Sequence, residues 1–454
     1  MKIIVAGDGK LGSSVTRQLS LEGNDLTVID LKESVLESSE GRYDVMSIQG
    51  NCAAMDVLDQ AGAKAADLLI AVTNSDEVNL LSCLTAFGMN PHIHTIARIR
   101  NPEYQEQIYK MRDIFALSMT VDPDRQTAVE MERLLKYPGF LQREPFAHGR
   151  VELVELKIEK GSRLCDVAMK DLHRTVNCNV LICTVVRNGS AISPDGNFVL
   201  KEGDRVFITA ATNELSTLLK NLNIITHKVR TVLICGGSRF AVYLTKLLQR
   251  SGIGVKIIEK DQSRCEYLAE ILPRAEIIRG DASKDYLLEG EDISSYDAVI
   301  SATGLDELNM IISMYALHCG VPQVLTKLGR GMEVNGSIIS SMNLGSTIAP
   351  KDLCCNNIVQ YVRAMKNQTG AALAVYSIAG GQAEAVEFRI DETCLHCGEP
   401  LKKIKTRKNV LVACLTRGSY TEIPNGDTYF QVGDTVVIMV SGGGVISNFN
   451  EIFV

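Results

Sequence analysis

The chain repeats itself at half its length, and this repeat constrains its fold more than any other feature. The segment Ile3–Gly12 matches Val232–Ala241 at an offset of 229 residues. Four further motifs match at 229 or 230 residues, the longest being Ala71–Asn79 with Ser301–Asn309. One offset held over five motifs indicates a tandem duplication, so we expect the two halves to fold alike.

Each half begins with short apolar segments that alternate with helical patterns. In the first half the predicted strands are 2–6, 25–30, 45–48, 68–72 and 95–99, and the predicted helices are 12–21, 55–61 and 77–87. Such alternation predicts a parallel sheet with helices on both faces. A smaller segment follows, with predicted strands at 151–158, 179–186 and 205–210, a predicted helix at 163–172, and turns at Asn188-Gly189 and Asp195-Gly196. Because such turns join antiparallel strands, the fold class is α/β, a tandem duplication of a Rossmann-like parallel-sheet domain followed by a small α+β domain.

A helix is predicted between the two lobes of each half. In the first half Pro123 precedes Arg125–Lys136, and in the second half Pro350 precedes Lys351–Met365. One face of the first helix is apolar, with Ala128, Met131, Leu134 and Leu135. Two interpretations stay open, a linker that packs on its own lobe and a helix that swaps between subunits. We place the domains at 1–120, 148–226, 227–346 and 371–454, with linker helices at 121–147 and 347–370.

Composition argues against several classes of protein. The 47 Lys and Arg residues stand against 54 Asp and Glu residues, and the chain has no Trp. A nucleic-acid binder would carry a basic face or stacking aromatics, so we expect no nucleic-acid partner. The sequence lacks a run of about 20 apolar residues, so we expect no transmembrane segment. Thirteen scattered cysteines predict reduced thiols and a cytoplasmic location.

Gly7-Asp8-Gly9-Lys10-Leu11-Gly12 stands between a predicted strand and a predicted helix. This is the pattern of a dinucleotide-binding turn, in which the middle glycine lets a diphosphate approach the backbone. Asp30 ends the second strand, where a carboxylate accepts hydrogen bonds from ribose hydroxyls and repels a 2′-phosphate. The first half should therefore bind NAD(H) or another unphosphorylated adenosine ribose, such as ATP or ADP.

The second half departs from this pattern. It reads Gly236-Gly237-Ser238-Arg239-Phe240-Ala241, so a serine replaces the middle glycine, while Glu259 keeps the acidic residue. Ser238 adds a Cβ where the diphosphate should approach, and Arg239 adds a charge that a phosphate would accept. Two interpretations stay open, a second nucleotide site and a structural relic.

We expect this protein not to be an enzyme. A dehydrogenase needs a proton donor or acceptor beside the nicotinamide. The seven histidines stand in no catalytic motif, and no Tyr-x-x-x-Lys pair occurs. Cys394-Leu395-His396-Cys397 has the spacing of metal ligands, but it lacks a second pair of ligands nearby. We therefore interpret Cys394 and Cys397 as free thiols and expect no metal site.

Together these motifs resemble the RCK/KTN (regulator of potassium conductance) family of nucleotide-binding domains. The resemblance is carried by the glycine-rich turn, Asp30, Gly50-Asn51-Cys52, Ala71–Asn79 and Ala97-Arg98. The lobe at 151–222 is similar to the companion C-terminal domain of that family. Two such pairs in one chain resemble the cytosolic regulatory subunits of bacterial Trk potassium uptake systems.

The resemblance implies a function and a set of site residues. It implies NAD(H) and ATP or ADP as ligands, a homo-oligomeric ring (a dimer or a tetramer), and docking on a membrane potassium-translocating subunit at the inner face of the cell membrane. The implied positions are Gly7, Asp8, Gly9, Lys10 and Leu11 at the phosphates, Asp30 at the ribose, Asn51 and Cys52 by the adenine, Thr73 and Asn74 at the far strand end, and Arg98 at the phosphates. The corresponding positions of the second half are Gly236, Gly237, Ser238, Arg239, Phe240, Glu259 and Thr303, with Lys327 aligned roughly with Arg98.

The alternative functions are an NAD-dependent oxidoreductase with two nucleotide sites, the soluble part of another transporter or exchanger, and a transcription regulator. The acidic balance of the chain and the lack of a helix-turn-helix pattern weigh against the last of these.

Overall fold

The structure is a computed structural model that describes residues 1–111, 114–136, 140–146, 150–212, 214–222, 229–329, 342–366, 372–378, 382–418, 420–441, 446 and 448–454. The chain divides into two compact units. The first comprises residues 1–129, 328–331 and 349–361, and the second comprises the rest. The domain boundaries predicted at 147/148, 226/227 and 370/371 lie outside the described residues.

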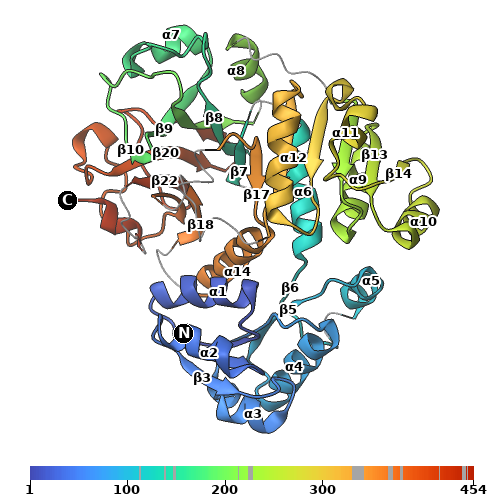
Figure 1. Cartoon of the computed structure of the whole chain (residues 1–454). Helices are drawn as coiled ribbons and strands as arrows, with labels where there is room; N and C mark the ends of the chain where they lie inside the picture. Colours follow the sequence, from blue (N-terminus) through green and yellow to red (C-terminus); the bar gives the residue numbers. More distant parts are fainter. Residues whose placement is uncertain are drawn as a thin grey trace. The chain divides into compact units, whose positions relative to one another are not determined.

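The first unit contains a parallel sheet of six strands (Figure 1). The strands are β1 (Lys2–Ala6), β2 (Asp25–Asp30), β3 (Met46–Gln49), β4 (Leu68–Ala71), β5 (His94–Arg98) and β6 (Met119–Val121), in the order β3-β2-β1-β4-β5-β6. The order reverses direction between β1 and β4. In open parallel sheets ligands bind at such a reversal, outside the carboxyl ends of the strands.

The helices of this lobe are α1 (Lys10–Leu21), α2 (Glu33–Glu40), α3 (Met55–Gln60), α4 (Asp76–Met89) and α5 (Pro102–Lys110). Alternate residues of β1 are buried on opposite faces of the sheet, because strand side chains point to opposite sides in turn. Ile4 and Ala6 pack in one cluster with residues of α3 and α4, and Ile3 and Val5 are buried as well. Burial on both faces confirms the predicted parallel sheet covered by helices.

The second unit repeats this lobe. Its strands are β12 (Thr231–Cys235), β13 (Gly254–Glu259), β14 (Glu276–Arg279), β15 (Ala298–Ser301), β16 (Gln323–Lys327) and β17 (Ser346–Ile348), in the order β14-β13-β12-β15-β16-β17. Its helices are α9 (Arg239–Arg250), α10 (Gln262–Ile271), α11 (Asp285–Gly290) and α12 (Asp306–His318). The same topology at the same offset confirms the predicted duplication.

Two antiparallel sheets form the small lobes, which both lie in the second unit. The first consists of β7 (Gln142–Phe146), β8 (Val151–Lys157), β9 (Val180–Arg187), β10 (Ser190–Ile192) and β11 (Arg205–Ala211), with α7 (Leu172–Val176) and α8 (Leu215–Asn221). The second consists of β18 (Ala372–Ile378), β19 (Ala383–Arg389), β20 (Val410–Arg417), β21 (Tyr420–Glu422) and β22 (Thr435–Ser441). Residues of both sheets share one core cluster, which includes Leu153, Cys183, Phe207, Ala385, Cys414 and Met439. The two sheets therefore pack against each other.

The helix predicted at 163–172 is wrong. The segment 163–166 forms turns, Asp166 has a left-handed φ of 62°, and only the 3-10 turn η3 (Met169–Asp171) precedes α7. The amides of this segment donate to a neighbouring loop, from Asp166 to the carbonyl of Leu200 at 2.9 Å and from Met169 to that of Phe198 at 3.0 Å. Those long-range bonds replace the helical ones. The other 3-10 turns are η1 (Ala63–Ala65), η4 (Ile293–Ser295), η6 (Leu401–Lys403) and η7 (Phe449–Ile452).

The linker helices α6 (Pro123–Lys136) and α14 (Pro350–Lys366) each contribute to both units. The predicted apolar face of α6 is buried, with Ala128 and Met131 fully inaccessible. In the second unit, Gln323 donates to the carbonyl of Leu134 at 2.9 Å. In the first unit, Cys354 of α14 donates to Gln126 of α6 at 2.8 Å. The start of α14 thus belongs to the first unit and its end to the second. Packing on its own lobe and exchange between subunits both stay predictions.

Candidate functional site

The glycine-rich turn between β1 and α1 is shaped by close backbone contacts. Gly7 has a φ of 92° and donates its N–H to the carbonyl of Ile29 at 2.7 Å. A Cβ at Gly7 would lie 2.8 Å from the backbone N and Cα of Thr73, and one at Gly12 would lie 1.9 Å from the carbonyl oxygen of Gly7. Gly7 needs glycine because the turn passes close to the residues after β4, and Gly12 because α1 packs directly on the carbonyl of Gly7.

Gly9 differs from these two glycines because it faces open space. It is the N-cap residue of α1, and no atom of the described residues lies within 4 Å of where its Cβ would be. No described side chain caps the helix at this end. The first N–H groups of a helix lack partners within the helix and attract anions. Lys10 beside them is exposed, whereas the side chain of Leu11 is buried in the core.

The carboxylate of Asp30 holds the turn from the end of β2. Its two oxygens accept the N–H of Asp8 at 2.8 Å and the N–H of Lys32 at 3.0 Å. The side chain is only half-buried. A carboxylate has about four lone-pair sites, so hydroxyl donors from outside can still bind to it.

Asp8 is buried beneath the turn, with 3% of its surface exposed. Its carboxylate accepts hydrogen bonds from Ser39 of α2 and, at 3.4 Å, from Thr16 of α1. Burial raises the pKa of Asp8 to about 6; the two hydroxyls oppose the shift and the nearby charge of Asp30 adds to it. Because this carboxylate points into the protein and the N–H of Asp8 is donated to Asp30, Asp8 shapes the turn and does not offer its side chain to a phosphate.

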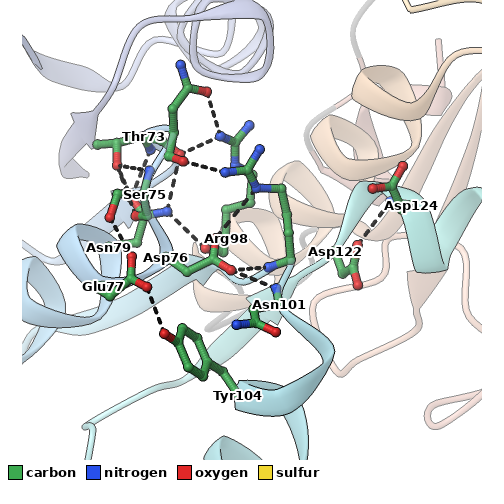
Figure 2. A network of polar contacts seen from close by, with 12 residues as sticks. Thr73, Ser75, Asp76, Glu77, Asn79, Arg98, Asn101, Tyr104, Asp122 and Asp124 are labelled. Atoms are coloured by element: carbon green, nitrogen blue, oxygen red, sulfur yellow. Dashed lines mark hydrogen bonds and ion pairs between the residues drawn. The ribbon is translucent and has the colours of Figure 1, made fainter. Parts of the chain in front are cut away.

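A polar network joins the ends of β4 and β5 (Figure 2). The N–H and hydroxyl of Thr73 both donate to Asn79 Oδ1, at 2.8 and 2.7 Å, and the amide of Asn79 donates to the carbonyl of Arg98 at 2.9 Å. The guanidinium of Arg98 donates to the carbonyl of Thr73 and, at 2.9 Å, to the side chain of Asn74. Thr73, Asn74 and Arg98, which the family resemblance implied, therefore lie together at the carboxyl edge of the sheet. Our prediction missed Asn79, although it recurs as Asn309 in the repeat.

Asp76 and Arg100 were also missed. Asp76, in the first turn of α4, is buried and accepts the N–H groups of Arg100 and Asn101, both at 2.7 Å. The guanidinium of Arg100 donates to the carbonyl of Asn74. Asp76 thereby fixes the loop after β5 beside Arg98. Nothing in the local sequence signals this role, because it depends on a contact between separate strand ends.

Asn51 and Cys52 follow β3. Asn51 is exposed, and its side chain accepts the N–H of Ala53 at 3.1 Å. The thiol of Cys52 is buried and accepts a hydrogen bond from Ser82 at 3.3 Å, and burial raises its pKa. Of this pair, only Asn51 offers a side chain at the surface.

The second half keeps the same framework. Gly236 has a φ of 112°, and Glu259 accepts the N–H of Gly237 at 2.7 Å and that of Asp261 at 2.9 Å. Thr303 donates its N–H to Asn309 at 2.8 Å, as Thr73 does to Asn79. Both halves therefore have a carboxylate at the end of the second strand that binds the turn amides, and both have the hydrogen-bonded Thr–Asn pair. These contacts belong to the duplicated fold.

The second turn differs in its surroundings. Arg264 of α10 donates to the carbonyl of Gly237 at 2.6 Å. Phe240 is fully buried, and the ammonium of Lys327 lies 4.9 Å from the centre of its ring, a cation–π geometry. Ser238 and Arg239 are exposed. The open Gly9 position of the first half thus carries a side chain here, and Phe240 belongs to the core.

The described residues contain no cluster of three or more His, Cys, Asp or Glu side chains suited to a metal ion. Within the same residues, no helix is both long enough and apolar enough to cross a membrane.

Comparison with known proteins identifies the family. The TrkA-N domain model matches residues 3–116 and 232–333, and the TrkA-C domain model matches residues 153–223 and 385–452. The chain belongs to the TrkA family. It is 30% identical to the Trk system potassium uptake protein TrkA of Vibrio alginolyticus, over 100% of this chain and 98% of that protein. It is 31% identical to a TrkA homolog of Archaeoglobus fulgidus, over the full length of both.

Solved structures agree on the fold of this TrkA-family chain. The crystal structure of the GsuK RCK domain matches with a TM-score of 0.61 and 14% identity, over 97% of this chain and 92% of that one. The GsuK channel bound to NAD matches with a TM-score of 0.60 and 14% identity, over 97% of this chain and 76% of that one. At this identity the likeness concerns the fold alone.

Proposed function

We propose that this TrkA-family chain is a nucleotide-sensing regulatory subunit of a membrane potassium uptake system and that it is not an enzyme. Its full-length relatives are named as potassium uptake proteins, which supports the system. The single observation that best supports nucleotide binding is the open position at Gly9. It lies at the start of a helix that no described side chain caps.

The ligand we propose is NAD(H), with ATP or ADP as competitors for the same turn. Gly7 to Leu11 would line the diphosphate, with the N–H groups at the start of α1 as its donors, and Arg98 would add positive charge. Asp30 would accept the ribose hydroxyls, and its charge would disfavour a 2′-phosphate. Asn51 would lie by the adenine, with Cys52 behind it, and Thr73 and Asn74 would line the far strand end. Gly236 to Phe240, Glu259 and Thr303 would form a weaker second site.

The proposed mechanism is a shift between conformations. Ligands that share a diphosphate but differ beyond it can favour different arrangements of the lobes, and the shift cannot exceed their difference in affinity for those arrangements. Such coupling is typically about 1–3 kcal/mol per site. We propose that a homo-oligomeric ring, docked at the inner face of the cell membrane, passes this shift to a potassium-translocating subunit. We also propose that the chain is divided into four domains and two linker helices, as predicted from the sequence.

The proposed nucleotide site can be tested by exchanging Gly9 and Ser238, the residues at the middle positions of the two glycine-rich turns. Gly9→Ser copies the second half into the first, and we expect it to weaken NADH binding at least about tenfold, or 1.4 kcal/mol. Ser238→Gly should strengthen binding at the second turn. Isothermal titration calorimetry on the full chain measures both. Since a Cβ at Gly9 meets no described atom, folding should not change. Equal affinity in wild type and Gly9→Ser would contradict the proposal.

Asp30→Ala tests the ribose contact. A hydrogen bond to a charged group is worth about 1.5–3 kcal/mol, so NADH, NAD, ATP and ADP should each bind about 10- to 150-fold more weakly. Asp67→Ala is the matched control, because Asp67 also accepts a backbone N–H, that of Lys2 at 2.8 Å, but at the opposite edge of the sheet. Unchanged affinity in Asp30→Ala, or turnover of NADH with a reducible substrate, would refute the assignment.

A further inference from the structure

Cys394 and Cys397 stand at the first and fourth positions of a turn in the second small lobe. Leu395 and His396 are its central residues. A β-turn brings its first and fourth Cα atoms within about 7 Å, and a disulfide needs about 4.4–6.8 Å. The turn therefore brings the backbone of the two cysteines near the separation that a disulfide requires.

The two thiols differ in accessibility. Cys397 is exposed, whereas Cys394 is partly buried against the core of the lobe. Burial raises the pKa of the Cys394 thiol to about 11. A reagent from solution would therefore meet Cys397 first, with Cys394 behind it as the second thiol.

The same turn occurs in the first small lobe without the second sulfur. There Ser162 and Cys165 take the places of Cys394 and Cys397. The amide after each turn donates to a matching loop, from Asp166 to Leu200 at 2.9 Å and from Gly398 to Phe430 at 2.8 Å. Because the turn forms with serine at its first position, the fold does not need a cysteine there. The turn geometry itself therefore does not require the second cysteine.

A metal ion is a poor fit for this pair. A structural zinc site takes four ligands, and the described residues offer no third ligand that would extend the pair into a cluster. The ring of His396 packs edge-on against Phe453, with centroids 4.6 Å apart, and its Nδ1 lies 3.2 Å from Glu399. Two thiols suffice for a disulfide but not for zinc.

We propose that Cys394 and Cys397 form a reversible intramolecular disulfide when a low-molecular-weight disulfide is the oxidant. The Cys397 thiolate attacks one sulfur of the oxidant, which forms a mixed disulfide and releases one small thiol. Cys394 then loses its proton and attacks Cys397 Sγ as a thiolate, which forms the internal S–S bond and releases the second small molecule as a thiolate that takes up a proton. The two protein thiols lose two electrons and two protons, and the oxidant gains them as two thiols.

The surroundings of the turn favour ring closure without unfolding. The N–H of Leu395 donates to Asn450 Oδ1 at 3.1 Å, and the amide of Asn450 donates to the carbonyl of Thr393 at 2.9 Å. These bonds tie the turn to the segment near the C-terminus. Oxidation should therefore change the sulfur atoms and leave the lobe folded.

Redox titration of the full chain tests the proposal. The protein is equilibrated with reduced and oxidised glutathione, quenched with acid, alkylated and digested with trypsin. Mass spectrometry of the peptide Ile390–Lys402 should show it unalkylated and two hydrogen masses lighter in most molecules under oxidising conditions, and fully alkylated under reducing ones. Cys165, which has serine as its turn partner, should carry at most a mixed disulfide with glutathione.

Two variants and one metal measurement decide the result. Cys394→Ser should abolish the internal bond and leave a mixed disulfide on Cys397. Ser162→Cys should create the same redox-dependent bond in the first small lobe. The proposal is overturned if the wild-type peptide carries only free thiols or mixed disulfides under the most oxidising buffer. It is also overturned if the purified protein holds stoichiometric zinc that Cys394→Ser releases.

Discussion

Gly7→Ala is expected to destabilise the first nucleotide-binding lobe by about 2–5 kcal/mol. The backbone of Gly7 is left-handed, and its Cβ would lie 2.8 Å from backbone atoms of Thr73. A left-handed conformation costs an alanine about 1–2 kcal/mol. Forcing an extra carbon into a packed region costs about 1–3 kcal/mol more, since the neighbour here is backbone and cannot rotate away.

Gly23→Ala separates the two costs. Gly23 also has a left-handed φ, 68°, but no described atom lies within 4 Å of its Cβ position. It should lose only the conformational cost of about 1–2 kcal/mol. Hydrogen exchange of the amides in β1 and β4 on the full chain measures both variants, because the chain has several domains and one global unfolding transition is not assured. Equal losses of protection in the two variants would contradict the steric account.

Asp8→Asn is expected to stabilise the same lobe at neutral pH. The pKa of Asp8 is about 6 in the folded protein, against 3.8 for an unperturbed carboxyl. Between those values the unfolded chain has released the proton and the folded chain retains it, so stability falls as pH rises from about 4 to 6. About two pKa units at 1.36 kcal/mol each give a cost of about 3 kcal/mol above pH 6. A neutral side chain of the same shape should remove most of that cost.

Measuring hydrogen-exchange protection of β1 from pH 4 to pH 8 tests this prediction, after correction for the intrinsic exchange rate. The wild type should lose protection across that window, and Asp8→Asn should show a flatter profile that meets the wild type at the acid end. Ser39→Ala removes a hydroxyl that lowers the pKa of Asp8, so the loss of protection should begin at the same pH but continue to higher pH. A wild-type profile as flat as that of Asp8→Asn would refute the assignment.

Much of the fold was predictable because its signals are local or repeated. A strand buried on both faces is apolar throughout, and the glycine pattern marks a turn whose geometry few other residues allow. Because the two halves repeat, each motif of the first half could be compared with its counterpart in the second half. The helix predicted at 163–172 failed because its amides bond to the loop that ends at Leu200, and local periodicity says nothing about so distant a partner.

The site divides in the same way. Residue type and spacing placed Asp30 at the carboxyl edge of the sheet, and the family resemblance added Thr73, Asn74 and Arg98, which lie at the same edge because the carboxyl ends of parallel strands meet there. The burial of Asp8, the anchoring of the loop after β5 by Asp76, and the start of α14 within the first unit could not be predicted. Each depends on which segments, far apart in the chain, come into contact. The sequence alone therefore determined the duplicated topology and its glycine turns, whereas only tertiary packing decided which polar groups face solvent and which are enclosed.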